Sequence, residues 1–261
     1  MSDNTVTPLQ TLDQRGWRAG LSTLMSAGFG AWWRTNEWWI QALLWTVVIN
    51  GSVAVAVWGD APEDLDLFTL YGVMTMFAAI AVAILMQEAI VGEKRSGTAA
   101  WVLSKPVSRE AFMLSKLVPN AVGVVVTMIA IPSAFLLLQT TLAGIDVSVP
   151  RFALGASVVA LNLLFYLTLT LMLGTLFDSA GPVIAIPLAF AFGQQLIAGI
   201  PGLGSLIPWA LVVGTEGSDT SVVGAIITGQ PVPAPGAILT TAVACGVFTA
   251  VAFWKWNRTE F

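Results

Sequence analysis

Six apolar segments, each long enough to cross a bilayer as a helix, dominate this chain. Their approximate limits are residues 38–58, 67–89, 116–142, 152–177, 181–200 and 236–256. A helix needs about 20 mostly apolar residues to cross the hydrocarbon layer. A membrane β-barrel would instead alternate polar and apolar residues in segments of about ten, whereas these segments are apolar on every side. We therefore expect an all-α integral membrane protein with six transmembrane helices.

The composition supports one membrane domain over residues 1–261. Hydrophobic residues make up 56% of the chain and charged residues only 10%, against roughly a quarter charged in an ordinary soluble domain. No repeat and no long linker divides the sequence. The formal net charge of −4 argues against a nucleic-acid partner, which would require clustered positive charge. The partner that composition does predict is membrane lipid.

The residue types needed for catalysis or cofactor binding are scarce. The sequence has no histidine, and its one cysteine, Cys245, lies inside an apolar segment where we expect it to pack. Neither a metal site nor a nucleophile with its base can be assembled from what remains. A phosphate-binding Gly-x-x-x-x-Gly-Lys-Ser/Thr loop is also absent from the sequence. We expect a chain that is not an enzyme and binds no cofactor.

The basic residues predict how the chain is oriented. Ten of the eleven Lys and Arg residues fall on one side of the six spans, and Arg151 alone falls on the other. Short cytoplasmic loops are enriched in Lys and Arg. We therefore expect both termini to be cytoplasmic, in a plasma or inner membrane. The ten are Arg15, Arg18, Arg34, Lys94, Arg95, Lys105, Arg109, Lys116, Lys255 and Arg258.

Residues 16–37 are less apolar than a span and rich in tryptophan. Trp17, Leu21, Leu24 and Gly28 fall on one stripe of a helix. Indole rings favour the headgroup layer, so this stretch is predicted to be an interfacial helix before the first span. The alternative is that the tryptophans belong to the start of one long first helix.

Helix-breaking residues interrupt the chain after the fifth span. Pro201, Gly202, Gly204 and Pro208 exclude a continuous helix there. Broken backbone at membrane depth is tolerated only where it is buried in protein or lines a watery cavity. We expect residues 201–228 to form short half-helices near the outer surface, as a re-entrant segment or external gate. A plain extracellular loop with two apolar turns is the alternative.

The charged segment, residues 93–109, reads EKRSGTAAWVLSKPVSR and lies between the second and third spans. With its flanks it predicts a loop from residue 88 to about residue 116. Gly97 or Thr98 is expected to cap a short helix over residues 99–103, and Ser108 to cap the next helix. A short helix between two breaks suits docking to a soluble partner. Its cations would alternatively serve only as orientation signals and lipid-headgroup contacts.

Residues 92–116, GEKRSGTAAWVLSKPVSREAFMLSK, resemble the cytoplasmic segment of permeases of the type-2 family of ATP-binding-cassette exporters. The acid, the Gly-Thr pair, the Leu and the Pro-Val-Ser-Arg run stand in the family's order. An interfacial helix, six spans and broken helices before the sixth span agree with that family. Residues 173–186 are similar to its inner turn between spans four and five, with Asp178 in place of a basic residue.

The resemblance implies that this chain is one half of a transporter. Two copies, or this chain and a paralogue, would join two cytoplasmic ATPase subunits that bind ATP and Mg. The charged segment would then be a coupling segment with a short coupling helix. The docking residues implied are Glu93, Lys94, Arg95, Gly97, Thr98, Lys105, Pro106 and Arg109.

Polar residues inside the spans are few. Glu88, at the inner end of the second span, either pairs with Arg95 or Arg109 or extends into water. Gln194 and Gln195 point in directions about 100° apart on a helix, so at least one is a candidate for a transport pathway or a subunit contact. No span carries a titratable group at mid-membrane, which favours an ATP-driven exporter of a hydrophobic or amphiphilic cargo. A secondary carrier or an ATP-independent scaffold is the alternative.

Overall fold

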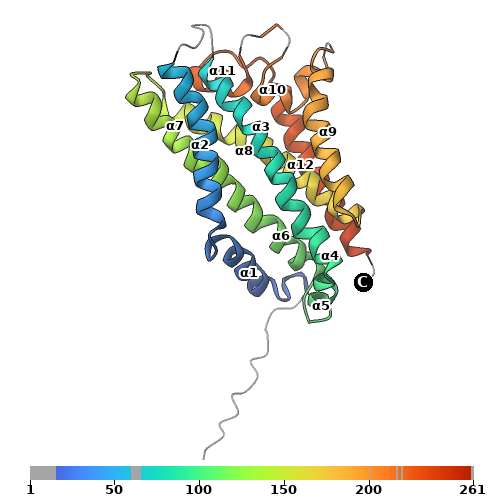
Figure 1. Cartoon of the computed structure of the whole chain (residues 1–261). Coiled ribbons are helices and arrows are strands. Elements are labelled where there is room, and N and C mark those ends of the chain that lie inside the picture. The colour runs from blue at the N-terminus through green and yellow to red at the C-terminus, as the bar shows by residue number, and fades with distance from the viewer. Residues whose placement is uncertain (1–15, 60–65, 201, 216, 219, 260–261) are drawn as a thin grey trace, which may run out of the picture.

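The computed structural model describes residues 16–59, 66–200, 202–215, 217–218 and 220–259. All regular elements among them are helices, so the expected all-α fold is confirmed. Six of these helices are long and apolar enough to cross a membrane, as the sequence predicts (Figure 1). Their bounds are Glu37–Trp58, Leu67–Arg95, Arg109–Leu142, Val149–Leu176, Ala180–Ala198 and Pro235–Asn257.

Two of the six spans contain a π-helical turn. The second span is α3 (Leu67–Gln87), a π-turn over Glu88–Gly92, and α4 (Glu93–Arg95). The third span is α6 (Arg109–Val124), a π-turn, and α7 (Ile131–Leu142). A π-turn holds one extra residue without ending the helix, so both spans continue through it.

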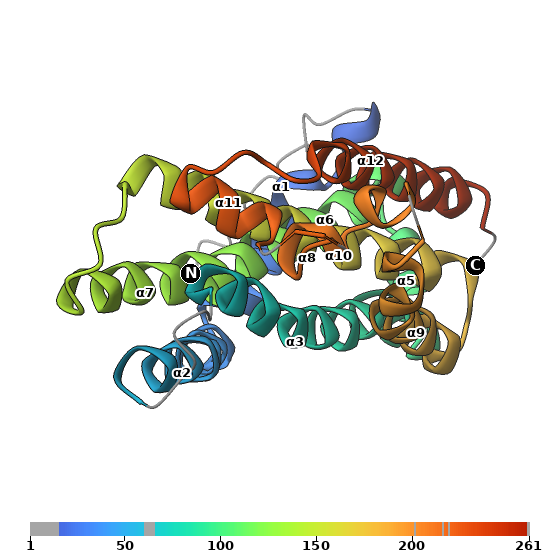
Figure 2. The same ribbon diagram turned by 90° about the horizontal axis from the view of Figure 1, so that it is seen from above.

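The fourth span, α8 (Val149–Leu176), forms the centre of the bundle. Its most apolar stretch is 61% buried, whereas those of α2 (Glu37–Trp58), α9 (Ala180–Ala198) and α12 (Pro235–Asn257) are 17–22% buried. Viewed from above, α8 runs between α3 and α12 (Figure 2). The outer helices therefore expose apolar faces of the kind that lipid or another subunit covers.

The two ends of the bundle carry different short helices. The helices α1 (Leu21–Trp33) and α5 (Thr98–Leu103) lie at the end where α12 finishes, and α10 (Trp209–Val212) and α11 (Val222–Thr228) lie at the opposite end (Figure 1). The described basic residues other than Arg151 belong to segments at the α1 and α5 end. The one-sided distribution of cations is thus a property of the folded chain.

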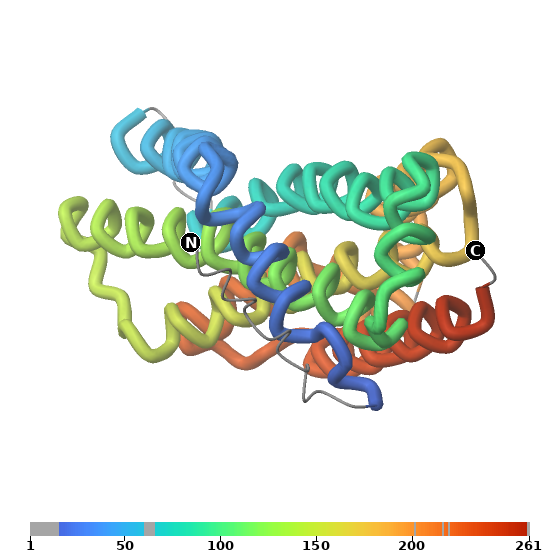
Figure 3. The backbone as a smooth tube through the Cα atoms, turned by 90° about the horizontal axis from the view of Figure 1, so that it is seen from below, coloured from blue at the N-terminus to red at the C-terminus, as the bar shows by residue number. Residues whose placement is uncertain are grey.

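The helix α1 is separate from the first span and crosses the ends of the bundle (Figure 3). The chain turns through residues 34–36 before α2 begins at Glu37, so the alternative of one continuous first helix is not what the structure has. Trp32 packs on Gly123, where no side chain would fit, and its Nε1 donates to Asn120 Oδ1 at 3.0 Å. These contacts fix α1 against α6.

The segment after α9 forms the expected short helices. A 3-10 turn over Gly204–Leu206 precedes α10, and α11 follows, with the hydroxyl of Ser221 accepting from Gly224 N at its start. Most residues of α10 and α11 are buried, and both helices pack against α3 and α8. Of the four helix breakers, Pro201 lies outside the described residues.

Candidate functional site

The charged segment is more helical than the sequence suggests. The expected loop from residue 88 to 116 is wrong at both ends, because the second span continues to Arg95 and the third begins at Arg109. The chain stays helical through Gly92 up to Ser96-Gly97, and a good N-cap already stands at Ser108. Only residues 96–108 leave the two long helices, and α5 occupies the middle of them.

The entry to α5 depends on a glycine. Gly97 has φ 74°, a left-handed conformation that side chains rarely adopt, and it stands at the N-cap of α5. Beside it, the hydroxyls of Ser96 and Thr98 lie 2.8 Å apart in a hydrogen bond. Of the two predicted caps, Gly97 is the one observed. The sharp reversal at Gly97 makes α5 project from the end of the bundle.

The exit from α5 is tied to the N-terminal segment. Ser108 Oγ accepts from Ala111 N at 3.0 Å, which confirms the predicted cap, and it donates to the carbonyl of Trp17. The backbone N–H of Ser108 donates to the carbonyl of Ala19 at 3.0 Å. The end of the charged segment is therefore fixed to the stretch that leads into α1.

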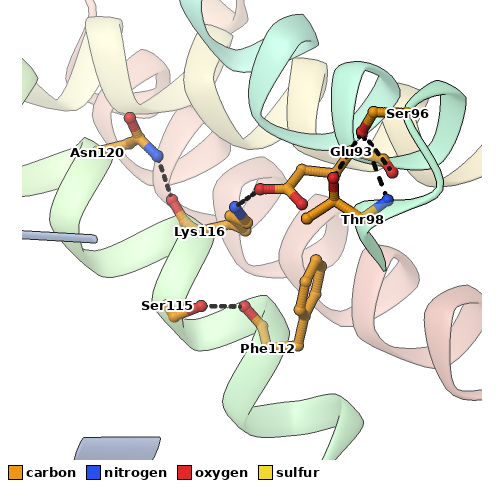
Figure 4. A network of polar contacts seen from close by, with 7 residues as sticks. All are labelled: Glu93, Ser96, Thr98, Phe112, Ser115, Lys116 and Asn120. Carbon is orange, nitrogen blue, oxygen red and sulfur yellow. Dashed lines mark hydrogen bonds and ion pairs between the residues drawn. The ribbon is translucent and has the colours of Figure 1, made fainter. Parts of the chain in front are cut away.

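Three charged residues of the segment point inward and bind the transmembrane helices. The first is Glu93, whose carboxylate forms an ion pair with Lys116 on α6 (Figure 4). Both side chains are little more than one-fifth exposed, and Lys116 Nζ also lies 5.3 Å from the centre of the Phe112 ring. This pair joins the end of the second span to the start of the third.

The second inward contact is made by Lys94. Its Nζ donates to Asp178 Oδ1 at 3.0 Å and to the carbonyls of Thr175 and Phe177 at 3.2 and 3.3 Å. These carbonyls end α8, where the helix dipole favours a cation. Asp178, which stands where the resemblance implies a basic residue, thus has a partner within the chain.

The third inward contact is made by Arg109. Its Nη1 lies within hydrogen-bond distance of the carbonyls of Trp256, Asn257 and Thr259 at the end of α12. Next to it, the rings of Phe112 and Trp256 stack with centroids 5.0 Å apart. The start of α6 is therefore joined to the end of α12.

The other predicted docking residues face outward. Arg95, Gly97, Thr98, Lys105 and Pro106 are exposed. With them lies Trp101, which is 64% exposed and has Lys105 Nζ 5.1 Å from the centre of its ring. Trp101 was not predicted as a site residue, although a tryptophan on a short helix between exposed cations was a usable signal. Lys116 and Asp178 stand out in the sequence, but their partners Glu93 and Lys94 are distant in the chain and were not predicted.

The predicted polar residues of the spans separate into buried and exposed groups. Gln194 is buried, donates to Tyr166 OH at 2.7 Å, and accepts from the N–H of Trp209 at 2.9 Å, so it joins α8, α9 and α10. Gln195 is exposed on the outside of α9. Glu88 is exposed and accepts from Gln87 at 3.1 Å, while Arg109 donates elsewhere.

The gate candidates that the structure describes lie before α10. Gly202 has φ 82° and is exposed, whereas Gly204 and Pro208 are buried. A Cβ on Gly204 would collide with the carbonyl of Ala198, so this turn packs directly on the end of α9. Across the part of the chain that the structure describes, no group of three or more His, Cys, Asp or Glu side chains is placed to hold a metal ion.

The comparisons with known proteins give one family. The family model described as ABC-2 family transporter protein matches residues 34–260, which is most of the chain. A comparison with curated proteins gives no match.

Proposed function

This chain belongs to the ABC-2 family of transporter membrane proteins, and from that premise we propose that it is the permease subunit of an ATP-driven exporter. Membrane subunits of this family work with ABC ATPases. In the proposal, a separate ATPase subunit docks on the charged segment from the cytoplasm and binds the ATP and Mg. Two copies of this chain, or this chain and a paralogue, join two such ATPases, with both termini cytoplasmic.

The observation that carries the proposal is the division of the charged segment into two faces. Arg95, Trp101 and Lys105 face outward on or beside a short helix that projects from the bundle. A tryptophan and an arginine in such a position are the residue types that contribute most to protein interfaces. They form the proposed docking face.

The inward-facing residues of the charged segment are proposed to transmit movement of the ATPase to the spans. Glu93 contacts the third span, Lys94 contacts the end of the fourth, and Arg109 contacts the end of the sixth. A force applied to α5 therefore reaches four of the six spans, counting the second span, which carries Glu93 and Lys94. Coupling requires a rigid element that differs in its contacts between two states. The three inward contacts make the charged segment rigid. Glu93, Lys94 and Arg109 act in the proposal as transmitting residues.

The cargo proposed is hydrophobic or amphiphilic. Gln194 and Gln195 carry uncharged amides; Gln194 joins three helices and Gln195 faces outward. The middle of each described span carries no Asp, Glu, Lys, Arg or His, whereas an ion-driven carrier normally needs a buried titratable group. We therefore propose an energy source outside the chain.

The test is the ATPase activity of the transporter purified with its ATPase subunit and reconstituted in lipid. Reversing the exposed charges in Arg95→Glu with Lys105→Glu should abolish co-purification and the ATP turnover that depends on it. Arg34→Glu is the matched control, because Arg34 is an exposed cation in the turn between α1 and α2 and lies outside the charged segment. Full co-purification and turnover in the double variant would overturn the docking proposal.

A second arm of the test addresses the energy source. Cargo movement should require hydrolysable ATP and should persist when ion gradients are collapsed by ionophores. Movement driven by an ion gradient alone would identify a secondary carrier. Co-purification without any ATP-dependent movement would identify a scaffold.

A further inference from the structure

A cavity of about 580 Å³ lies beneath the charged segment, between α1, α2, the end of α3, α5 and α6. This volume falls in the range of pockets that hold small organic ligands. Its walls are largely apolar and include Leu24, Trp32, Leu85 and Phe112. It also reaches exposed residues of α1 and α2, so it opens to the surface of the bundle.

The charged residues that line the cavity are mainly acidic. Glu37, Glu88 and Glu93 line it from three different elements, and Lys116 is its single cation. Three carboxylates and one ammonium give a formal charge of −2. Lys116 is already paired with Glu93, and the second oxygen of that carboxylate, Oε2, is buried without a hydrogen-bond partner. Glu37 and Glu88 form no ion pair among the described residues.

The cavity is held open by rigid packing rather than by a flexible loop. Gly28 of α1 lies directly on α6, where an added Cβ would be 2.8 Å from the Ser115 carbonyl oxygen. Trp32 donates to Asn120, and Asn120 donates in turn to the carbonyl of Lys116 at 2.7 Å. Figure 4 shows that Lys116, on the same helix as Asn120, points toward Glu93. A preformed pocket costs little ordering when a ligand binds.

The distribution of charge and apolar surface defines the ligand. A bare metal ion does not fit, because the described acids are not grouped closely enough to hold one. Acidic side chains attract a cationic head. The apolar walls then accommodate an alkyl or aromatic body.

The geometry points to a binding site for an amphiphilic cation, with its ammonium head attracted by the carboxylates of Glu37, Glu88 and Glu93 and its apolar body against the walls that include Leu24 and Leu85. This proposal concerns the single chain. It does not rest on the docking of an ATPase, so the two proposals fail independently.

The test uses the full-length chain, purified alone in a non-ionic maltoside detergent. Saturable binding of radiolabelled tetradecyltrimethylammonium is measured by scintillation proximity, with tetradecyl sulfate as a competitor of equal chain length. The cation should bind at least about tenfold more tightly than the sulfate. In Glu37→Gln with Glu88→Gln its affinity should fall about five- to tenfold, since each partly exposed carboxylate contributes a few-fold.

Two further variants separate charge from shape. Asp146→Asn removes an exposed carboxylate at the opposite end of the bundle and should leave binding unchanged. Ala31→Phe should fill the cavity and weaken the cation and the sulfate alike. Equal affinity for cation and sulfate, or an equal loss in Asp146→Asn, would overturn the proposal.

The source of the ammonium group is distinguished by lipid competition. Displacement of the probe by phosphatidylethanolamine would support an aminophospholipid as the natural occupant. Probe binding that persists in excess phosphatidylethanolamine would support a free lipophilic amine. Displacement by phosphatidylglycerol as strong as that by phosphatidylethanolamine would contradict selection for a cation.

Discussion

The two ends of the bundle are held together by different chemistry. At the α5 end, Lys94 and Arg109 donate to the last carbonyls of α8 and α12, and Glu93 pairs with Lys116. At the α11 end, hydroxyl groups bonded to one carboxylate and close glycine contacts join the helices.

The α11 end centres on Asp66, whose Oδ2 accepts from Thr69 and Thr220 at 2.6 and 2.7 Å. Nearby, Ser221 N donates to Thr69 Oγ1 at 3.0 Å. Gly72 brings α3 against the backbone of α10 at Val212. The short helices at this end are mostly buried, whereas α5 projects outward.

The two ends should therefore respond differently to substitution. Replacing a side chain that is hydrogen-bonded to a helix end removes those bonds, whereas a side chain added between closely packed backbones displaces the helices that touch there. Stability measurements on variants of the two ends distinguish them.

Gly72→Val should be the most damaging change. A Cβ at residue 72 would lie 2.6 Å from the Val212 carbonyl oxygen, which is backbone and cannot turn aside. Overpacking costs about 1–3 kcal/mol and occasionally more, and contact with backbone atoms places this change at the upper end of that range. The thermal unfolding midpoint in detergent should fall clearly. Gly246→Ala, in α12 with no atom within 4 Å of the added Cβ, is the control and should be neutral or stabilising.

Arg109→Gln should be the most damaging change at the α5 end. The glutamine is too short to reach the carbonyls of Trp256, Asn257 and Thr259, and hydrogen bonds to charged groups contribute about 1.5–3 kcal/mol. Thermal unfolding should show a loss of about 2 kcal/mol. The variant should still co-purify with the ATPase, because this side chain faces inward. An unchanged unfolding midpoint would contradict the contact between α6 and α12.

Lys94→Met should lower the free energy of unfolding by about 1 kcal/mol, and Asp178→Asn should lower it by clearly less. The Lys94 side chain is 9% exposed and also serves two backbone carbonyls, whereas the Asp178 side chain is 92% exposed and remains hydrated when its partner is lost. Chemical unfolding of both variants and of the double variant measures the coupling between them. Equal losses in the two single variants would show that the ion pair alone matters.

Trp101→Ala should have the smallest effect on stability, below about 0.5 kcal/mol, because the side chain is 64% exposed. It should nevertheless weaken co-purification with the ATPase, since an exposed tryptophan on α5 contributes to the proposed docking face. Trp254→Ala is the matched control, with an exposed tryptophan on α12 outside the charged segment. A large loss of stability with normal co-purification would show that Trp101 stabilises the fold and does not belong to the proposed docking face.

Local features of the fold were predictable residue by residue. Ser108 was recognisable as a cap and Gly97 as a break, because each acts on the backbone beside it. The helical continuation from residue 88 to Arg95 was not predicted, because charged residues indicate a loop only where no other helix packs on them. In the structure other helices do pack there: the bundle covers the helix faces that carry Ile90 and Lys116.

The candidate site was predictable only as a segment. Glu93, Lys94 and Arg109 looked like docking charges of the same kind as Arg95 and Lys105. Their partners lie 23, 84 and about 150 residues away in the chain, which no local pattern records. The role of Gln194 could not be predicted for a similar reason, because its partners Tyr166 and Trp209 lie 28 and 15 residues away on two other helices.

The sequence alone determined that this chain has six helices long and apolar enough to cross a membrane, has most of its cations at one end and breaks its helices before the last span. Those properties follow from the transfer of single segments between water and lipid and from local backbone preferences. Only the tertiary structure decided which charges face water, which ones bind helix ends, and where a cavity remains. These outcomes depend on which helices become neighbours, and uniformly apolar helices carry little information about their neighbours.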